Sequence, residues 1–115
     1  MDTRSKIVSL EAALEAAQAP KSAAITGYFD PVTVEHARSL EASRRECGGP
    51  LVVFITEPPE PVMSAAARAE VVAGIAAVDL VALAPDGVDV TGARHEERAD
   101  ADRFERLLDR VNRRR

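Results

Sequence analysis

Apolar residues follow two spacings along the chain, one typical of helices and one of buried strands. Residues three and four positions apart predict helices at 10–17, after a cap at Thr33, after a cap at Ser64, and around 104–111. Short apolar runs predict strands at 22–26, 51–55 and 80–84, with 88–90 as a candidate minimal edge strand. This alternation predicts an α/β fold, namely a small Rossmann-like three-layer domain with a parallel sheet of three to four strands and flanking helices.

The same spacing predicts which side chains face the core. The strand at 51–55 is apolar throughout, so we expect it near the centre of the sheet. The inward helix positions are predicted to be Val34, Ala37 and Leu40, then Ala67, Val71, Val72 and Ile75. The stripe of Phe104, Leu107, Leu108 and Val111 packs either on its own sheet or on a second subunit. Residues 85–87 are predicted to form a turn.

The length of 115 residues fits a single domain, 1–115, and is too short for two independent cores. Hydrophobic residues make up 46% of the chain but aromatic residues only 3%, so each core contact buries little area. We therefore expect a homodimer, in which a second copy adds buried surface.

Charge and cysteine content narrow the expected partners and location. A net charge of −4 has the wrong sign for sequence-independent nucleic-acid binding. No apolar run approaches the roughly 20 residues that cross a bilayer, so we expect neither membrane insertion nor a signal peptide. The single cysteine, Cys47, allows no internal disulfide, and a cytoplasmic location is the expectation.

The segment from Gly27 to His36 is the candidate for chemistry, because it follows a predicted strand and leads into a helix. Ligands of parallel sheets bind outside the carboxyl ends of the strands. The free N–H groups and the positive dipole end of a helix N-terminus favour anions, and Gly27 permits close approach of a phosphate.

This segment resembles the nucleotidyltransferase superfamily that carries a His-x-Gly-His motif, whose members read Gly-x-Phe-Asp-x-x-His-x-Gly-His after the first strand. The resemblance extends to 6–11 before the motif and to 68–75 and 78–81 after it. These stretches look like the adenylyltransferase domain of heptose-phosphate enzymes and the related glycerol-phosphate cytidylyltransferases. The order of elements agrees from Lys6 to Ala84.

The resemblance implies roles for particular residues. It places nucleotide or phosphate contacts at Gly27, Tyr28, Phe29, Asp30, Thr33, Glu35 and His36, with Arg68 of the third helix as a further candidate. The two motif histidines of the family stabilise the α-phosphate while a substrate phosphate or hydroxyl attacks it, and pyrophosphate leaves with help from Mg²⁺. The implied ligand is thus a nucleotide or phosphorylated metabolite, and the implied cofactor is Mg²⁺ with a nucleoside triphosphate.

Several positions depart from the family pattern. Thr33 replaces the first motif histidine, so only His36 remains of the catalytic pair, and a hydroxyl cannot become cationic. Glu35 replaces the motif glycine, and its charge about 4 Å from a phosphate would cost about 4 kcal/mol at an effective dielectric near 20. The family's lysine-bearing loop is here the acidic, proline-rich segment 57–61, and its late Ser-Thr-rich motif has no counterpart. The resemblance therefore implies a domain with a shortened C-terminus.

Each candidate also has a structural interpretation. Asp30 is expected to shape the loop by accepting backbone N–H groups, and Arg68 to pair with Glu70 or solvent. His36 is either a pocket residue or a helix-start histidine bonded to a loop carbonyl. The remaining candidates have mainly structural interpretations: Tyr28 and Phe29 as core side chains, 95–97 as a solvated turn rather than a metal site, and Cys47 as incidental.

Three functions are compatible with these features. The first is a nucleotidyltransferase-like domain of weakened or lost activity that binds a nucleotide or phosphorylated metabolite at Gly27 to His36. The second is an active cytidylyl- or adenylyltransferase on a sugar- or polyol-phosphate, in which a dimer partner supplies the missing cations. The third is a structural or interaction module without a ligand.

Overall fold

The computed structural model, which describes residues 2–85 and 88–113, contains one parallel four-stranded sheet. Its strands are β1 (Ala23–Gly27), β2 (Leu51–Ile55), β3 (Leu80–Leu83) and β4 (Arg94–His95), in the order β3-β2-β1-β4. All neighbouring strands pair in parallel. The predicted α/β class is confirmed, and so is the interior position of β2.

The helices begin where the sequence places capping residues. The structure contains η1 (Thr3–Lys6), α1 (Leu10–Ala17), α2 (Val34–Glu46), α3 (Ala65–Ala73) and α4 (Glu97–Arg113). Ser9, Thr33 and Ser64 each accept a backbone N–H from the first turn of the following helix. The predicted caps of the second and third helices are therefore confirmed, because a side-chain oxygen satisfies an otherwise unpaired donor.

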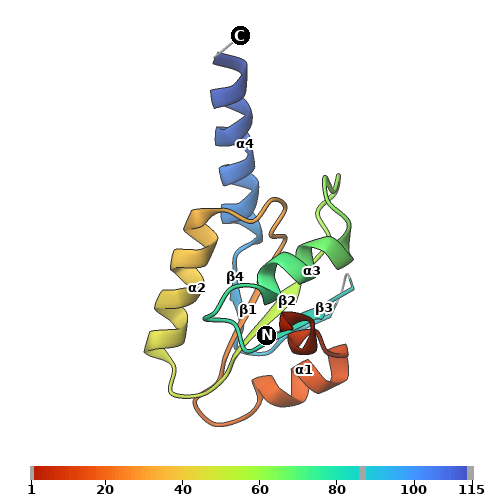
Figure 1. The fold of residues 1–115 in the computed structure, drawn as a ribbon, viewed down its shortest axis with the longest axis vertical. Helices are drawn as coiled ribbons and strands as arrows, with labels where there is room; N and C mark the ends of the chain where they lie inside the picture. The colour runs from red at the N-terminus through yellow and green to blue at the C-terminus, as the bar shows by residue number, and fades with distance from the viewer. Residues whose placement is uncertain (1, 86–87, 114–115) are drawn as a thin grey trace.

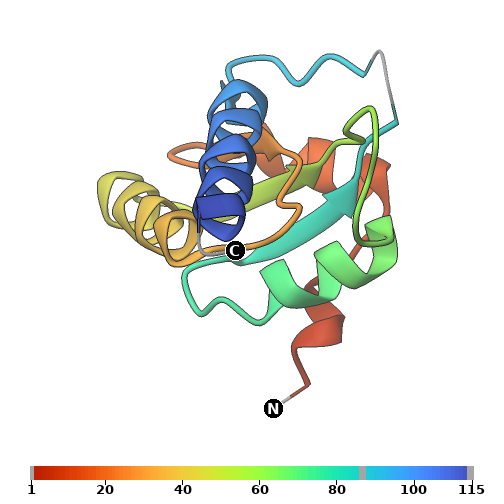
Figure 2. The same cartoon turned by 90° about the horizontal axis from the view of Figure 1, so that it is seen from above.

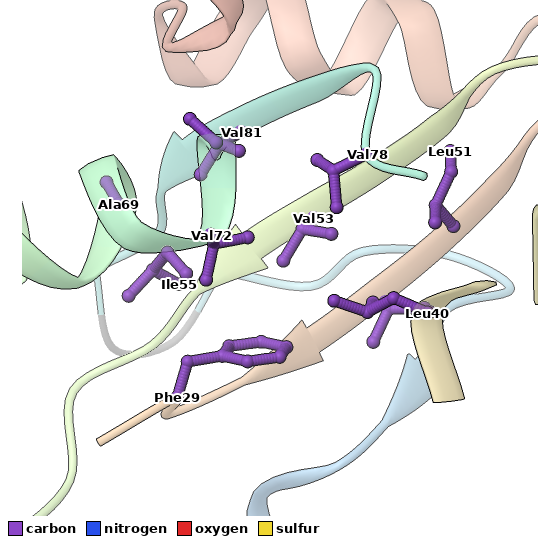
Figure 3. Close-up of a cluster of buried hydrophobic side chains, with 11 residues drawn as sticks. Phe29, Leu40, Leu51, Val53, Ile55, Ala69, Val72, Val78 and Val81 are labelled. Carbon is purple, nitrogen blue, oxygen red and sulfur yellow. The ribbon is translucent and has the colours of Figure 1, made fainter. Parts of the chain in front are cut away.

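The core consists of two apolar layers, one on each face of the sheet. Alternate residues of β2 supply both layers, since successive side chains in a strand point to opposite faces. On the face covered by α2 and α3, the first layer includes Phe29, Leu40, Val53, Val72 and Val81, as Figure 3 shows. On the face covered by α1, the second layer includes Ala13, Val52, Phe54 and Ala82. Together these form the three layers of an α/β domain.

Some predicted positions are wrong. The fourth strand lies at 94–95 and not at 88–90, which carry no strand assignment. Val34 is 66% exposed in the first turn of α2, ahead of the buried Leu40, and Val71 is 45% exposed on α3. Arg68 and Ala69 occupy the inward face of α3 together with Val72, so the helix is rotated relative to the predicted face. The predicted turn at 85–87 includes 86 and 87, which lie outside the described residues.

The strand order creates a switch point between β1 and β4. From β1 the chain adds β2 and β3 on one side and then returns to place β4 on the other side. In parallel sheets this is the point at which a crevice opens at the carboxyl ends of the strands. The candidate loop follows β1 there, and α4 starts beside it and then projects away from the body (Figures 1 and 2). Within the described ranges, no helix is long and apolar enough to cross a membrane.

Candidate functional site

Gly27 ends β1 in a position that has no room for a side chain. A Cβ at this residue would lie 2.7 Å from Cε2 of Phe29 and 3.0 Å from Oδ2 of Asp100. In the structure, an aromatic ring and a carboxylate from α4 lie where the sequence predicts the close approach of a phosphate.

Two successive backbone N–H groups in the loop point at that carboxylate. The N–H groups of Tyr28 and Phe29 donate to Oδ2 of Asp100, at 2.8 and 3.3 Å. Phe29 has a φ of 50°, a left-handed conformation that costs a non-glycine residue about 1–2 kcal/mol. Successive N–H groups that converge on one acceptor form an anion-binding concavity. Strained residues of this kind concentrate at functional sites.

The imidazole of His36 completes the concavity. Its Nδ1 accepts the Thr33 N–H at 2.9 Å, so a neutral ring carries its proton on Nε2. Nε2 contacts Oδ1 of Asp100, and both side chains are buried. The ring also packs against Phe29, with centroids 5.0 Å apart. His36 thus presents an N–H donor to the same anion that the loop backbone binds.

Thr33 has a structural role in this arrangement. Its hydroxyl accepts the His36 N–H while its own N–H donates to the His36 ring, which together make a capping box for α2. Thr33 therefore fixes the orientation of the His36 ring.

Asp100 is the residue at this site that sequence reasoning missed. It is 6% exposed and comes from α4, some 70 residues after the loop it contacts. A signal was present in the sequence, since Asp100 lies four residues before Phe104 and continues the apolar stripe of Leu107 and Val111. A carboxylate on the apolar side of an amphipathic helix requires a buried partner.

Asp30 and Arg68 have roles in holding the loop. The Asp30 carboxylate accepts hydrogen bonds from the N–H groups of Val62 and Met63, at 2.6 and 2.9 Å. Asp30 therefore shapes the loop as its structural interpretation predicts, although the donors come from a segment some 30 residues away. Arg68 is fully buried, and its guanidinium donates to backbone carbonyls and to Glu57 rather than to Glu70. The carbonyls belong to Tyr28, Thr56 and Met63.

Glu35 lies away from the loop N–H groups. Its side chain is 62% exposed and pairs with Arg106 of α4 at 3.7 Å. With Arg110, these residues line a hollow of about 220 Å³ at the start of α2. The acid that faces the Tyr28 and Phe29 N–H groups is therefore Asp100, whereas Glu35 forms an ion pair with Arg106.

A second hollow of about 280 Å³ opens beside the loop, between the proline-rich segment and α4. Its apolar lining comes from Tyr28, Pro58, Pro59, Val62, Ala101 and Phe104. Its charged lining consists of Asp30, Glu60, Asp100 and Glu105. In the part of the chain that the structure describes, no lysine or arginine lines this hollow, so its charge opposes a triphosphate.

The remaining candidates do not form a site. Among residues 2–85 and 88–113, no group of three His, Cys, Asp or Glu side chains is placed to hold a metal ion. The 95–97 segment is not a solvated turn, since His95 ends β4 and both His95 and Glu97 contact the Thr26 hydroxyl. Cys47 is a half-buried free thiol at the end of α2.

Comparisons with known proteins give no identification. No family model matches the chain, and no curated protein matches it. The inference of function therefore depends on the residues around the loop and on the fold that positions them.

Proposed function

We propose that this chain is a nucleotidyltransferase-like domain that binds the phosphate group of a nucleotide or phosphorylated metabolite at the Gly27 to His36 loop, with little or no transferase turnover. The observation that carries the proposal is the convergence of the Tyr28 and Phe29 N–H groups and the His36 ring on one carboxylate. Donors arranged for a carboxylate also suit a phosphate oxygen, because both are anionic acceptors.

The position of the loop supports the same proposal. It lies at the carboxyl end of β1, where the order of the parallel strands reverses, and it leads into the N-terminus of the 13-residue helix α2. Ligands of α/β sheets bind at such points, and the helix dipole adds a partial positive charge near the loop.

The charges around the loop argue against efficient transfer. Arg68, the nearest buried cation, is engaged by carbonyls and by Glu57, and Arg106 accompanies Glu35. Pyrophosphate departure requires cations near the leaving group. Phosphate binding by N–H groups requires no cation, so phosphate binding without turnover fits the described residues better than nucleotidyl transfer does.

The described residues do not fit a resident Mg²⁺ ion. Asp30 already accepts two backbone N–H groups, and Glu35 faces an arginine. Mg²⁺ is usually held by one or two carboxylates together with substrate phosphates. Our proposal therefore assigns no step to a protein-bound metal.

Calorimetric titration with CTP, ATP and glycerol 3-phosphate, with and without Mg²⁺, tests the proposal. We expect weak, saturable binding of at least one phosphorylated ligand. His36→Leu should weaken it about tenfold or more, since a hydrogen bond to a charged group contributes about 1.5–3 kcal/mol. His36→Gln, whose amide can still donate, should retain part of it.

His95→Leu, a change in the chain's other histidine, is the matched control and should bind like the original protein. Pyrophosphate release with a panel of sugar- and polyol-phosphates should stay near background, and release at rates of about 1 s⁻¹ or more would favour an active transferase. If no phosphorylated ligand binds either the original chain or the Asp100 variants described below, the module without a ligand becomes the better account.

We also propose that two copies associate through the outer half of α4. Leu107, Leu108 and Val111 are 41–48% exposed along a helix that projects from the body (Figure 1). A second copy presents the same apolar stripe, and burying both removes apolar area from water. Sedimentation equilibrium should show a dimer that Leu108→Lys dissociates and Asp109→Lys leaves intact. A monomer at every concentration would contradict this.

A further inference from the structure

We propose that Asp100 is an internal plug, a carboxylate that occupies the phosphate position and must leave, together with the first turns of α4, before a ligand binds. This inference rests on the proposed function and adds its regulation. Its basis is that the loop N–H groups and His36 Nε2, the donors that would bind a phosphate, are already directed at Asp100.

The space around the carboxylate makes the two occupants mutually exclusive. Asp100 is 6% exposed, and the hollow that it lines together with His36 and Thr33 is only about 10 Å³. That is room for about one water molecule and not for a phosphate group. Gly27 and the Phe29 ring lie on the other side of the Asp100 carboxylate, so close that a Cβ at residue 27 would lie 3.0 Å from Oδ2 of Asp100. A phosphate can therefore bind the N–H groups of Tyr28, Phe29 and His36 only after the Asp100 carboxylate has left them.

The helix that carries the plug is fastened at its start, and farther along it contacts the start of α2 through the exposed Arg106–Glu35 pair. Glu97 accepts a hydrogen bond from the Thr26 hydroxyl, and Oε1 of Glu96 forms an ion pair with Nε of Arg94 at 3.1 Å. Beyond Phe104, Leu107 and Leu108 are 41% and 46% exposed, and Figure 1 shows this part of α4 standing clear of the sheet. Lifting the first turns of α4 thus breaks polar contacts, while the two apolar layers of the core, as far as the structure describes them, include no residue of this helix.

Because only molecules in which Asp100 has left the loop can bind phosphate, the apparent affinity equals the intrinsic affinity multiplied by the fraction of such open molecules. When the open state is populated at about 0.1–10%, the plug weakens binding about 10- to 1,000-fold. Asp100→Ala should therefore tighten the binding of inorganic phosphate and glycerol 3-phosphate by at least about tenfold. Asp102→Ala is the matched control, because it removes an exposed carboxylate two residues along the same helix, and its affinity should not change.

Chemical rescue provides a second, independent readout. Formate supplies the carboxylate that Asp100→Ala lacks, and it should raise the midpoint of thermal unfolding of this variant saturably, with no such effect on Asp102→Ala. Should Asp100→Ala fold too weakly to be titrated, Asp100→Asn keeps the shape while removing the charge, and its neutral oxygen holds the donors less strongly. Phosphate binding by Asp100→Asn should therefore still be tighter than that of the original chain, by less than for Asp100→Ala.

Hydrogen exchange of the intact chain reports the movement itself. With glycerol 3-phosphate bound, amides of 98–104 should exchange several times faster, while those of β2 stay protected.

The outcomes separate this proposal from the proposed function. Tighter binding by Asp100→Ala, together with formate rescue and faster exchange in 98–104, supports both. Equal binding by the original chain and the variant supports phosphate binding but overturns the plug, and so does weaker binding by the variant. If neither form binds phosphate or formate, both proposals fail.

Discussion

The orientation of His36 depends on a single turn of helix. Thr33 accepts from the His36 backbone and donates to its ring, so the imidazole cannot rotate without breaking the cap. The Nε2 proton is thereby directed toward Asp100 and away from solvent. Thr33 thus both caps the start of α2 and fixes the direction of the His36 donor.

Replacing the Thr33 hydroxyl should therefore reduce stability. Thr33→Ala removes the cap, and we expect a loss of about 1 kcal/mol in the free energy of unfolding, whereas Thr33→Ser should stay close to the original value. Urea denaturation followed by circular dichroism measures both. Equal stability of the alanine and serine variants would show that the cap contributes little.

Glu35 provides a residue-level test of which acid faces the loop. Because its carboxylate is exposed and beside Arg106, Glu35→Gln should change phosphate affinity by less than about threefold, since exposed charges are screened. Calorimetry with glycerol 3-phosphate measures the change. A gain as large as the one expected for Asp100→Ala would mean that Glu35, and not Asp100, opposes the ligand.

At the scale of elements, Arg68 connects parts of the chain that the sheet alone does not hold together. It donates to the carbonyls of Tyr28, after β1, and of Thr56, after β2, and to the carbonyl of Met63 before α3. Burial of a charge is tolerated only where such partners satisfy it. The arginine that the family resemblance suggests as a phosphate contact instead supports the loop from behind.

Arg68→Met should be strongly destabilising, because it leaves these carbonyls without their donor. We expect a loss of about 3 kcal/mol or more in the free energy of unfolding. Arg38→Met, an exposed position on α2, should change it by no more than about 0.5 kcal/mol. Thermal and urea unfolding provide both values. Similar stability of the two variants would contradict the structural role assigned to Arg68.

How far the sequence predicts the fold depends on the range of the interaction. Helix caps and strand β2 follow from local patterns, so the caps Thr33 and Ser64 were identified correctly. The face of α3 was not, because the partners that make Arg68 an inward residue are far from it in sequence. Asp100 was missed for the same reason.

On the scale of the whole molecule, the sheet and its helices form a compact body from which α4 extends (Figure 1). The extents of 49 × 29 × 28 Å reflect this projection. The helix thus connects two features of the molecule, the anion-binding loop at its start and the exposed apolar stripe toward its end. Ligand binding at the first and self-association at the second are then expected to influence each other, since both act on one helix.

Titration of the isotope-labelled full chain with inorganic phosphate, followed by NMR of the backbone amides, tests the central claim most directly. Our account predicts saturable shifts at Tyr28 and Phe29, with accompanying changes at Asp100 as its carboxylate leaves these N–H groups. Phosphate-induced shifts that occur elsewhere and spare Tyr28 and Phe29 would contradict it.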